Sequence, residues 1–126
     1  MKGYDMIAVN RTKGSLLGDR IELADSFFRR LAGLLGRPPL LEGEGLWITP
    51  CSSVHSIGMR YAIDVLFLDG RGTVIGAYPG LSPGRLTRLF PGAKGVLELP
   101  EGILLRTGTE RGDIVEFQDA PDARRS

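Results

Sequence analysis

Glycine and proline are spread along the whole chain, and their spacing limits what the chain can fold into. The 126 residues include 18 glycines and 8 prolines. Both residue types interrupt long helices and mark turns. The apolar runs between them are short and recur at intervals typical of β-strands. We therefore expect a mainly β (α+β) fold, a single compact, barrel-like antiparallel β domain with one short amphipathic helix.

The expected strands are all short and are separated by turn signals. They cover residues 6–12, 19–25, 45–49, 61–69, 73–78, 93–100, 103–108 and 114–117. The run "YAIDVLFLD" (residues 61–69) is apolar on both faces except for Asp64, which favours a central strand. The segment 79–92 is long and rich in glycine and proline. A loop of this length in a compact domain is usually either functional or loosely ordered.

One stretch, "DSFFRRLAGLLGR" (residues 25–37), has the pattern of an amphipathic helix. Its first residues, Asp25 or Ser26, can cap the helix, and Gly36 followed by two prolines can end it. The apolar residues recur at helical spacing, so we expect the helix to cover the sheet. They are Phe27, Phe28, Leu31, Leu34 and Leu35.

The size and charge of the chain exclude several classes of protein. One domain covering residues 1–117 accounts for the core, and the polar residues 118–126 predict a disordered tail. The formal net charge is +1, so the basic excess of nucleic-acid binders is missing. Apolar stretches are too short to span a membrane. We expect neither nucleic acid nor a membrane as partner. Because the first residues lack the apolar run of a secretory signal, we expect a cytoplasmic location.

The only cysteine, Cys51, and the only histidine, His55, lie four residues apart in "PCSSVHSIGMRYAIDVLFLD" (residues 50–69). A thiol nucleophile needs a base within hydrogen-bonding distance, and Asp64 could orient that base. The same three side chains could instead bind a metal ion. A thiol- or metal-dependent hydrolase using Cys51, His55 and Asp64 is therefore one hypothesis. Its signal is weak, because no nucleophile motif and no paired metal-ligand spacing surrounds these residues.

A non-catalytic binding or accessory module is the leading hypothesis. In this interpretation His55 and Arg85 donate hydrogen bonds to a polar or anionic small molecule, and Asp64 orients one of them. Aromatic and methionine side chains would exclude water. The predicted ligand-binding residues are Trp47, Cys51, His55, Met59, Arg60, Asp64 and Arg85. No metal site is assigned, and the cofactor and oligomeric state remain unknown. A structural protein-interaction domain with an apolar sheet edge is a third hypothesis.

Six motifs follow one another along the chain: "RRLAGLLGRPPL", "GLWITPCSSVHSIGMRYAIDVLFLD", "GTVIGAY", "LSPGR", "AKGVLELPEG" and "GDIVEF". Taken in this order, they resemble those of a family of small bacterial and archaeal proteins called domain of unknown function 192. The resemblance covers residues 6–117. It implies a compact, mostly β fold with a short helix, and it implies no activity.

Overall fold

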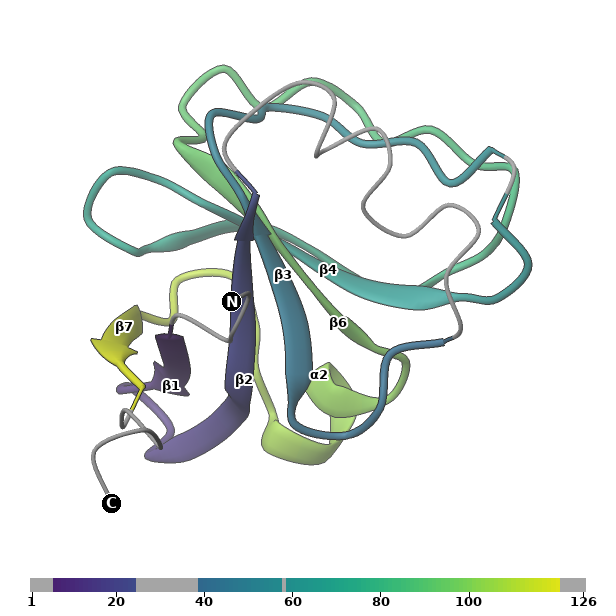
Figure 1. Ribbon diagram of the computed structural model, residues 1–126. Coiled ribbons are helices and arrows are strands. Elements are labelled where there is room, and N and C mark those ends of the chain that lie inside the picture. The colour runs from purple at the N-terminus through teal and green to yellow at the C-terminus, as the bar shows by residue number, and fades with distance from the viewer. Residues whose placement is uncertain (1–5, 25–38, 58, 121–126) are drawn as a thin grey trace.

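The structure is a computed structural model, and it describes residues 6–24, 39–57 and 59–120. It is mostly β, as expected, with seven strands and one short helix in this part of the chain (Figure 1). No helix among these residues is long and apolar enough to cross a membrane. The elements are β1 (Met6–Asn10), β2 (Ser15–Ala24), β3 (Glu44–Ile48), β4 (Ile63–Leu68), β5 (Val74–Leu81), β6 (Gly95–Pro100), α2 (Ile103–Thr107) and β7 (Val115–Asp119).

The seven strands form one curled sheet in the order β5-β4-β6-β3-β2-β1-β7. The edge strands β5 and β7 approach each other at one end of the curl. There Thr73 and Ile114 form an antiparallel bridge, and the amide of Val115 donates to the carbonyl of Gly72 over 2.8 Å. The sheet is therefore a curled half-barrel whose two edge strands touch at the start of β5.

Every neighbouring pair of strands is antiparallel except one. Strands β2 and β3 run parallel, with Leu23 opposite Trp47. Parallel neighbours need a long crossover connection. The segment 25–43 between the two strands is long enough to provide it. The expectation of a purely antiparallel sheet was wrong at this pair.

Both faces of the sheet are buried, so the protein has two apolar cores. Strand β4 is buried at all six positions and contributes alternately to each core. Leu66 and Leu68 belong to the first core, which also contains Trp47 and the helix α2. Ile63, Val65 and Phe67 belong to the second core. The expectation that this strand is central is confirmed.

The short helix is not the one that the sequence predicted. The predicted helix at 25–37 lies outside the described residues. Residues 103–108 were expected to form a strand returning beside β6, but Ile103–Thr107 is the helix α2. Strand β6 already lies between β4 and β3, so a returning strand would find no free edge. The chain instead turns at Gly102 and packs Ile103 and Leu104 into the first core.

The C-terminal strand is longer than expected. Gln118 and Asp119 were assigned to the disordered tail, but both belong to β7. They pair with Ile7 and Met6 of β1. Backbone pairing with β1 holds these two polar residues in the sheet, although their side chains are exposed.

Candidate functional site

The structure brings two of the predicted ligand-binding residues, His55 and Arg85, into neighbouring segments of backbone. The amide of Ser56 donates to the carbonyl of Arg85 over 2.8 Å. His55 forms an antiparallel bridge with Leu86. The side chains of His55 and Arg85 are both exposed. The part of the long 79–92 loop that follows β5 is therefore ordered by hydrogen bonds to the segment that contains His55.

Cys51 is a buried residue of the second core and is 5% exposed. Its thiol donates to the carbonyl of Ser53 over 3.1 Å. Met59 is half-buried and packs against the same core, whereas Arg60 is exposed. Attack on a substrate requires an accessible thiolate, so this burial does not favour the thiol-dependent hydrolase.

Asp64 lies in β4 in alternation with Leu66 and Leu68, so its side chain faces the first core. It is 0% exposed. Its carboxylate accepts hydrogen bonds of 2.8 Å from the amides of Gly80 and Leu104. One carboxylate oxygen thus links β4 to β5, and the other links β4 to the start of α2. The second core, with Cys51, lies on the other face of the sheet.

The described residues offer no obvious metal site. Within the ranges that the structure covers, no three His, Cys, Asp or Glu side chains lie close enough to hold a metal ion together.

A hollow of about 380 Å³ opens where the two edges of the sheet meet. Its walls come from the turn between β4 and β5, from β7, and from the ends of β3 and the loop before β6. The lining residues are Arg11, Trp47, Leu68, Asp69, Gly70, Arg71, Gly72, Lys94, Ile114, Val115, Glu116 and Phe117. Trp47 is the only residue of the predicted set that lines it.

Aromatic rings form an apolar wall of the hollow. The ring centroids of Trp47 and Phe117 are 4.8 Å apart and the rings are tilted by 44°. Trp47 sits directly over Gly95, where an added Cβ would lie 2.6 Å from the indole Cη2. The indole therefore needs glycine at this position of β6. An aromatic wall of this kind favours a ligand with a flat apolar part.

Three basic and two acidic side chains line the hollow, so its polar lining carries a net positive charge. Arg11 is paired with Glu116 at 3.5 Å. The carboxylate of Asp69 accepts hydrogen bonds from the amides of Arg71 and Thr73. The side chains of Arg71 and Lys94 make no ion pair with another residue in the described ranges. The excess positive charge favours an anionic group on the ligand.

The backbone around the hollow is held in place on two sides. The amide of Lys94 donates to the carbonyl of Leu68 over 2.8 Å. On the other side Gly72 has a φ of 85°, and an added Cβ there would collide with the carbonyl oxygen of Val115. Only glycine allows the turn between β4 and β5 to approach β7 so closely.

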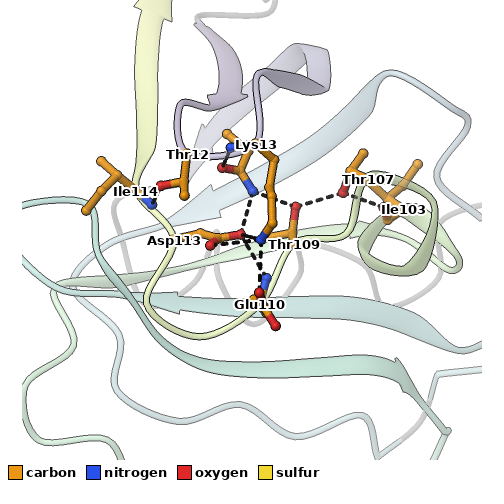
Figure 2. Close-up of polar contacts among 9 residues, drawn as sticks. Thr12, Lys13, Ile103, Thr107, Thr109, Glu110, Asp113 and Ile114 are labelled. Carbon is orange, nitrogen blue, oxygen red and sulfur yellow. Dashed lines mark hydrogen bonds and ion pairs between the residues drawn. The ribbon is translucent and has the colours of Figure 1, made fainter.

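A buried polar cluster fixes the turn beside the hollow (Figure 2). The carboxylate of Asp113 accepts hydrogen bonds from Asn10 over 2.9 Å, from Lys13 over 2.8 Å and from the amide of Glu110 over 3.1 Å. The bond from Glu110 means that Asp113 caps its own turn. The cluster ties the turn after β1 to the turn before β7, and so places Arg11 and Ile114 at the hollow.

The charged groups of this cluster shift each other's pKa values. Burial alone would raise the pKa of Asp113, but hydrogen bonds from Lys13, Asn10 and the amide of Glu110 outweigh it and lower the pKa. The hydrogen bond to Asp113 raises the pKa of Lys13, against an opposing effect of burial and with a further contribution from Glu110. Both groups are therefore held in their charged forms.

Glu98 of β6 is a second buried carboxyl group, 7% exposed. It lies opposite Leu46 and Val65, both of the second core. The structure gives it no hydrogen-bond partner among the described residues. Burial raises the pKa of Glu98 from 4.5 to about 7. This carboxyl group therefore titrates near neutral pH.

Sequence reasoning missed the cations of the hollow. Arg71 lies between the predicted strands 61–69 and 73–78, and Lys94 lies within the predicted strand 93–100. The hollow depends on the meeting of β5 and β7, the first and last strands in the sheet order. The sequence contained one weak signal of a basic surface, because Asp64 and Asp69 are the only acids between Glu44 and Glu98.

Comparisons with known proteins agree with this fold. UPF0127 proteins of Thermococcus sibiricus and Pyrococcus furiosus are 31% and 35% identical to the chain. The alignments cover 87% and 86% of this chain, and 73% and 96% of the relatives.

Two crystal structures share the fold. A protein of unknown function from Novosphingobium aromaticivorans is 24% identical with a TM-score of 0.77, covering 88% of this chain and 83% of that one. A Sinorhizobium meliloti protein is 20% identical with a TM-score of 0.76, covering 93% and 96%. The family model of domain of unknown function 192, described as "Uncharacterized ACR", matches residues 8–117. The chain therefore belongs to the domain of unknown function 192 family.

Proposed function

We propose that this protein is a non-catalytic binding module for a small anionic molecule with a flat apolar part. The proposal retains the ligand class expected from the sequence and moves the site to the hollow beside Trp47. The observation that carries it is the combination of an aromatic wall with two cations, Arg71 and Lys94, that have no acidic partner in the described ranges.

The chemistry of binding follows from the walls. Trp47 and Phe117 would contact the flat face of the ligand and exclude water from it. Arg71 and Lys94 would pair with its anionic group, and such charge-assisted hydrogen bonds are stronger than neutral ones. The hydrogen bonds of Lys94 to Leu68 and of Val115 to Gly72 fix the walls before the ligand arrives. A site built in advance loses little conformational entropy on binding.

The test uses 8-anilino-1-naphthalenesulfonate as an anionic aromatic probe. Trp47 is the only tryptophan, so its fluorescence can be followed by itself as the probe binds, and the variants below locate the binding site. We expect saturable binding that weakens about tenfold in the double variant Arg71→Gln/Lys94→Gln, because roughly 1.4 kcal/mol of charge-assisted bonding is lost.

Arg85→Gln is the matched control, because Arg85 is exposed and lies outside the hollow. It should bind the probe as tightly as the wild type. If Arg85→Gln loses binding and the double variant does not, the ligand occupies the rim predicted from the sequence, and the hollow is not the site.

A further inference from the structure

Two loops of this protein are joined into an exposed two-stranded ribbon, which we define as residues 54–57 and 84–87. The amide of Thr87 donates to the carbonyl of Val54 over 3.0 Å, and the amide of Gly84 to the carbonyl of Ser56 over 2.9 Å. Figure 1 shows the two segments running side by side beyond the ends of β3 and β5. The hollow proposed above involves none of these residues.

The two faces of the ribbon differ. Val54, Ser56 and Thr87 point inward and are buried. Because side chains alternate along extended backbone, the residues between them point outward. The bridge between His55 and Leu86 places these two side chains on that outward face. Ile57 follows on one strand and Arg88 just beyond the other.

The ribbon and the residues just after it expose large apolar side chains. Ile57 is 59% exposed, Leu86 is 73% exposed, and Leu89, just after the ribbon, is 58% exposed. These three are among only seven exposed large hydrophobic residues in the described part of the chain. Single exposed leucines are ordinary, but a cluster of them marks an interaction surface. The hydrogen bonds of the ribbon keep these side chains from folding back into the core.

The charge around the ribbon has one sign. The segments 50–62 and 82–93 contain Arg60, Arg85 and Arg88 and no acidic residue. Arg60 and Arg85 are exposed and have no ion-pair partner in the described ranges. The guanidinium of Arg88 lies 4.0 Å from the ring centre of Phe90 and donates to the carbonyl of Leu89. Arg88 therefore keeps its charge next to the exposed leucines.

We propose that this ribbon binds the surface of an anionic lipid bilayer, with Ile57, Leu86 and Leu89 entering the boundary between headgroups and acyl chains. Interfacial binding combines buried apolar area with electrostatic attraction to anionic lipids. The long arginine side chains can reach the headgroups while their stems stay apolar. The lack of acidic residues in the two segments favours an anionic bilayer over a protein partner, because attraction to anionic lipids requires no matching shape. The sequence predicted no membrane partner because its apolar stretches are too short to span a membrane. Binding of the ribbon to a membrane surface would revise that prediction.

The first test measures sedimentation of the protein with vesicles of phosphatidylcholine, with or without phosphatidylserine. We expect binding to the phosphatidylserine vesicles that weakens as salt is raised. The variant Leu86→Ser/Leu89→Ser should bind at least about tenfold more weakly. Leu105→Ser is the matched control, since Leu105 is 79% exposed and lies on α2. It should bind within about twofold of the wild type.

A second test separates insertion from simple charge attraction. Because Cys51 is buried, an environment-sensitive dye can be attached selectively to Leu86→Cys or to Leu105→Cys. The dye at position 86 should shift to the blue on phosphatidylserine vesicles, and the dye at position 105 should not. Absence of vesicle binding, equal binding by the double leucine variant, or binding without the shift at position 86 would each overturn the proposal. An acidic protein partner for the ribbon would give the first of these results.

Discussion

The carboxylate of Asp64 in β4 accepts a hydrogen bond of 2.8 Å from the backbone amide of Leu104 in α2. Its other oxygen accepts one of 2.8 Å from Gly80 of β5. A single acid with no exposure thus joins three elements around the first core. The bonds compensate the loss of hydration, because backbone amides take the place of water around the charge.

Replacing this acid should therefore destabilise the fold. The variant Asp64→Asn keeps the shape of the side chain but removes the charge and turns an amino group toward one backbone amide. We expect a loss of about 3 kcal/mol in the free energy of unfolding, measured with urea. The control Asp19→Asn alters an exposed acid of β2 and should change the stability little. A loss for Asp64→Asn no larger than that of the control would contradict the structural role.

Glu98 should make the protein less stable as the pH rises. Its pKa is about 7 in the folded protein and 4.5 is the ordinary value. Between these values the folded state binds more protons than the unfolded state, so the free energy of unfolding falls as pH increases. From about pH 5 to about pH 8, the wild type should lose up to about 3 kcal/mol relative to Glu98→Gln.

Denaturant titrations of both proteins at several pH values measure this difference. Glu101→Gln, at an exposed position one residue after β6, should follow the wild type. Parallel pH profiles for the wild type and Glu98→Gln would show that the buried carboxyl group does not titrate in this range.

Asp113 should make the protein less stable as the pH falls. Hydrogen bonds lower its pKa in the folded protein, so its contribution is complete above the ordinary value of 3.8 and is lost as the pH falls through the folded value. The variant Asp113→Ala should lose about 2 kcal/mol near neutral pH. It should then lose less further stability on acidification than the wild type does.

Thermal melts between neutral and acid pH measure this effect, with Asp119→Ala as an exposed control at the end of β7. An acid-induced loss as steep in Asp113→Ala as in the wild type would show that other groups cause it.

The buried thiol should be unreactive in the folded protein. Cys51 is 5% exposed within the second core. We expect the rate of its reaction with a thiol alkylator to be at least roughly a hundredfold below the rate in the unfolded chain. Rapid alkylation of the folded protein that titrates below about pH 8.5 would instead favour the thiol-dependent hydrolase.

The sequence predicted much of the fold because local patterns determine strands and turns. The continuous apolar run of β4 and the glycine-rich turn signals between strands belong to this class. The helix α2 was missed because its cause is not local. The residues Ile103–Thr107 would fit a strand, and only the occupied edges of β6 exclude one.

The site was harder to predict for the same reason. The hollow exists because Gly72 of the β4–β5 turn meets Val115 of β7, far away in the sequence. Scarcity of residue types pointed to Cys51 and His55, but scarcity says nothing about which face of a sheet a side chain occupies. Trp47 is the one residue of the predicted set that lines the hollow.

The most direct measurement of the proposed function is the ¹H–¹⁵N spectrum of the protein during titration with 8-anilino-1-naphthalenesulfonate. The single indole N–H signal belongs to Trp47. We predict that it shifts in a saturable way, together with the amide signals of Arg71 and Lys94, while that of Arg85 stays in place. An indole signal that does not move while signals elsewhere shift to saturation would contradict binding in the hollow.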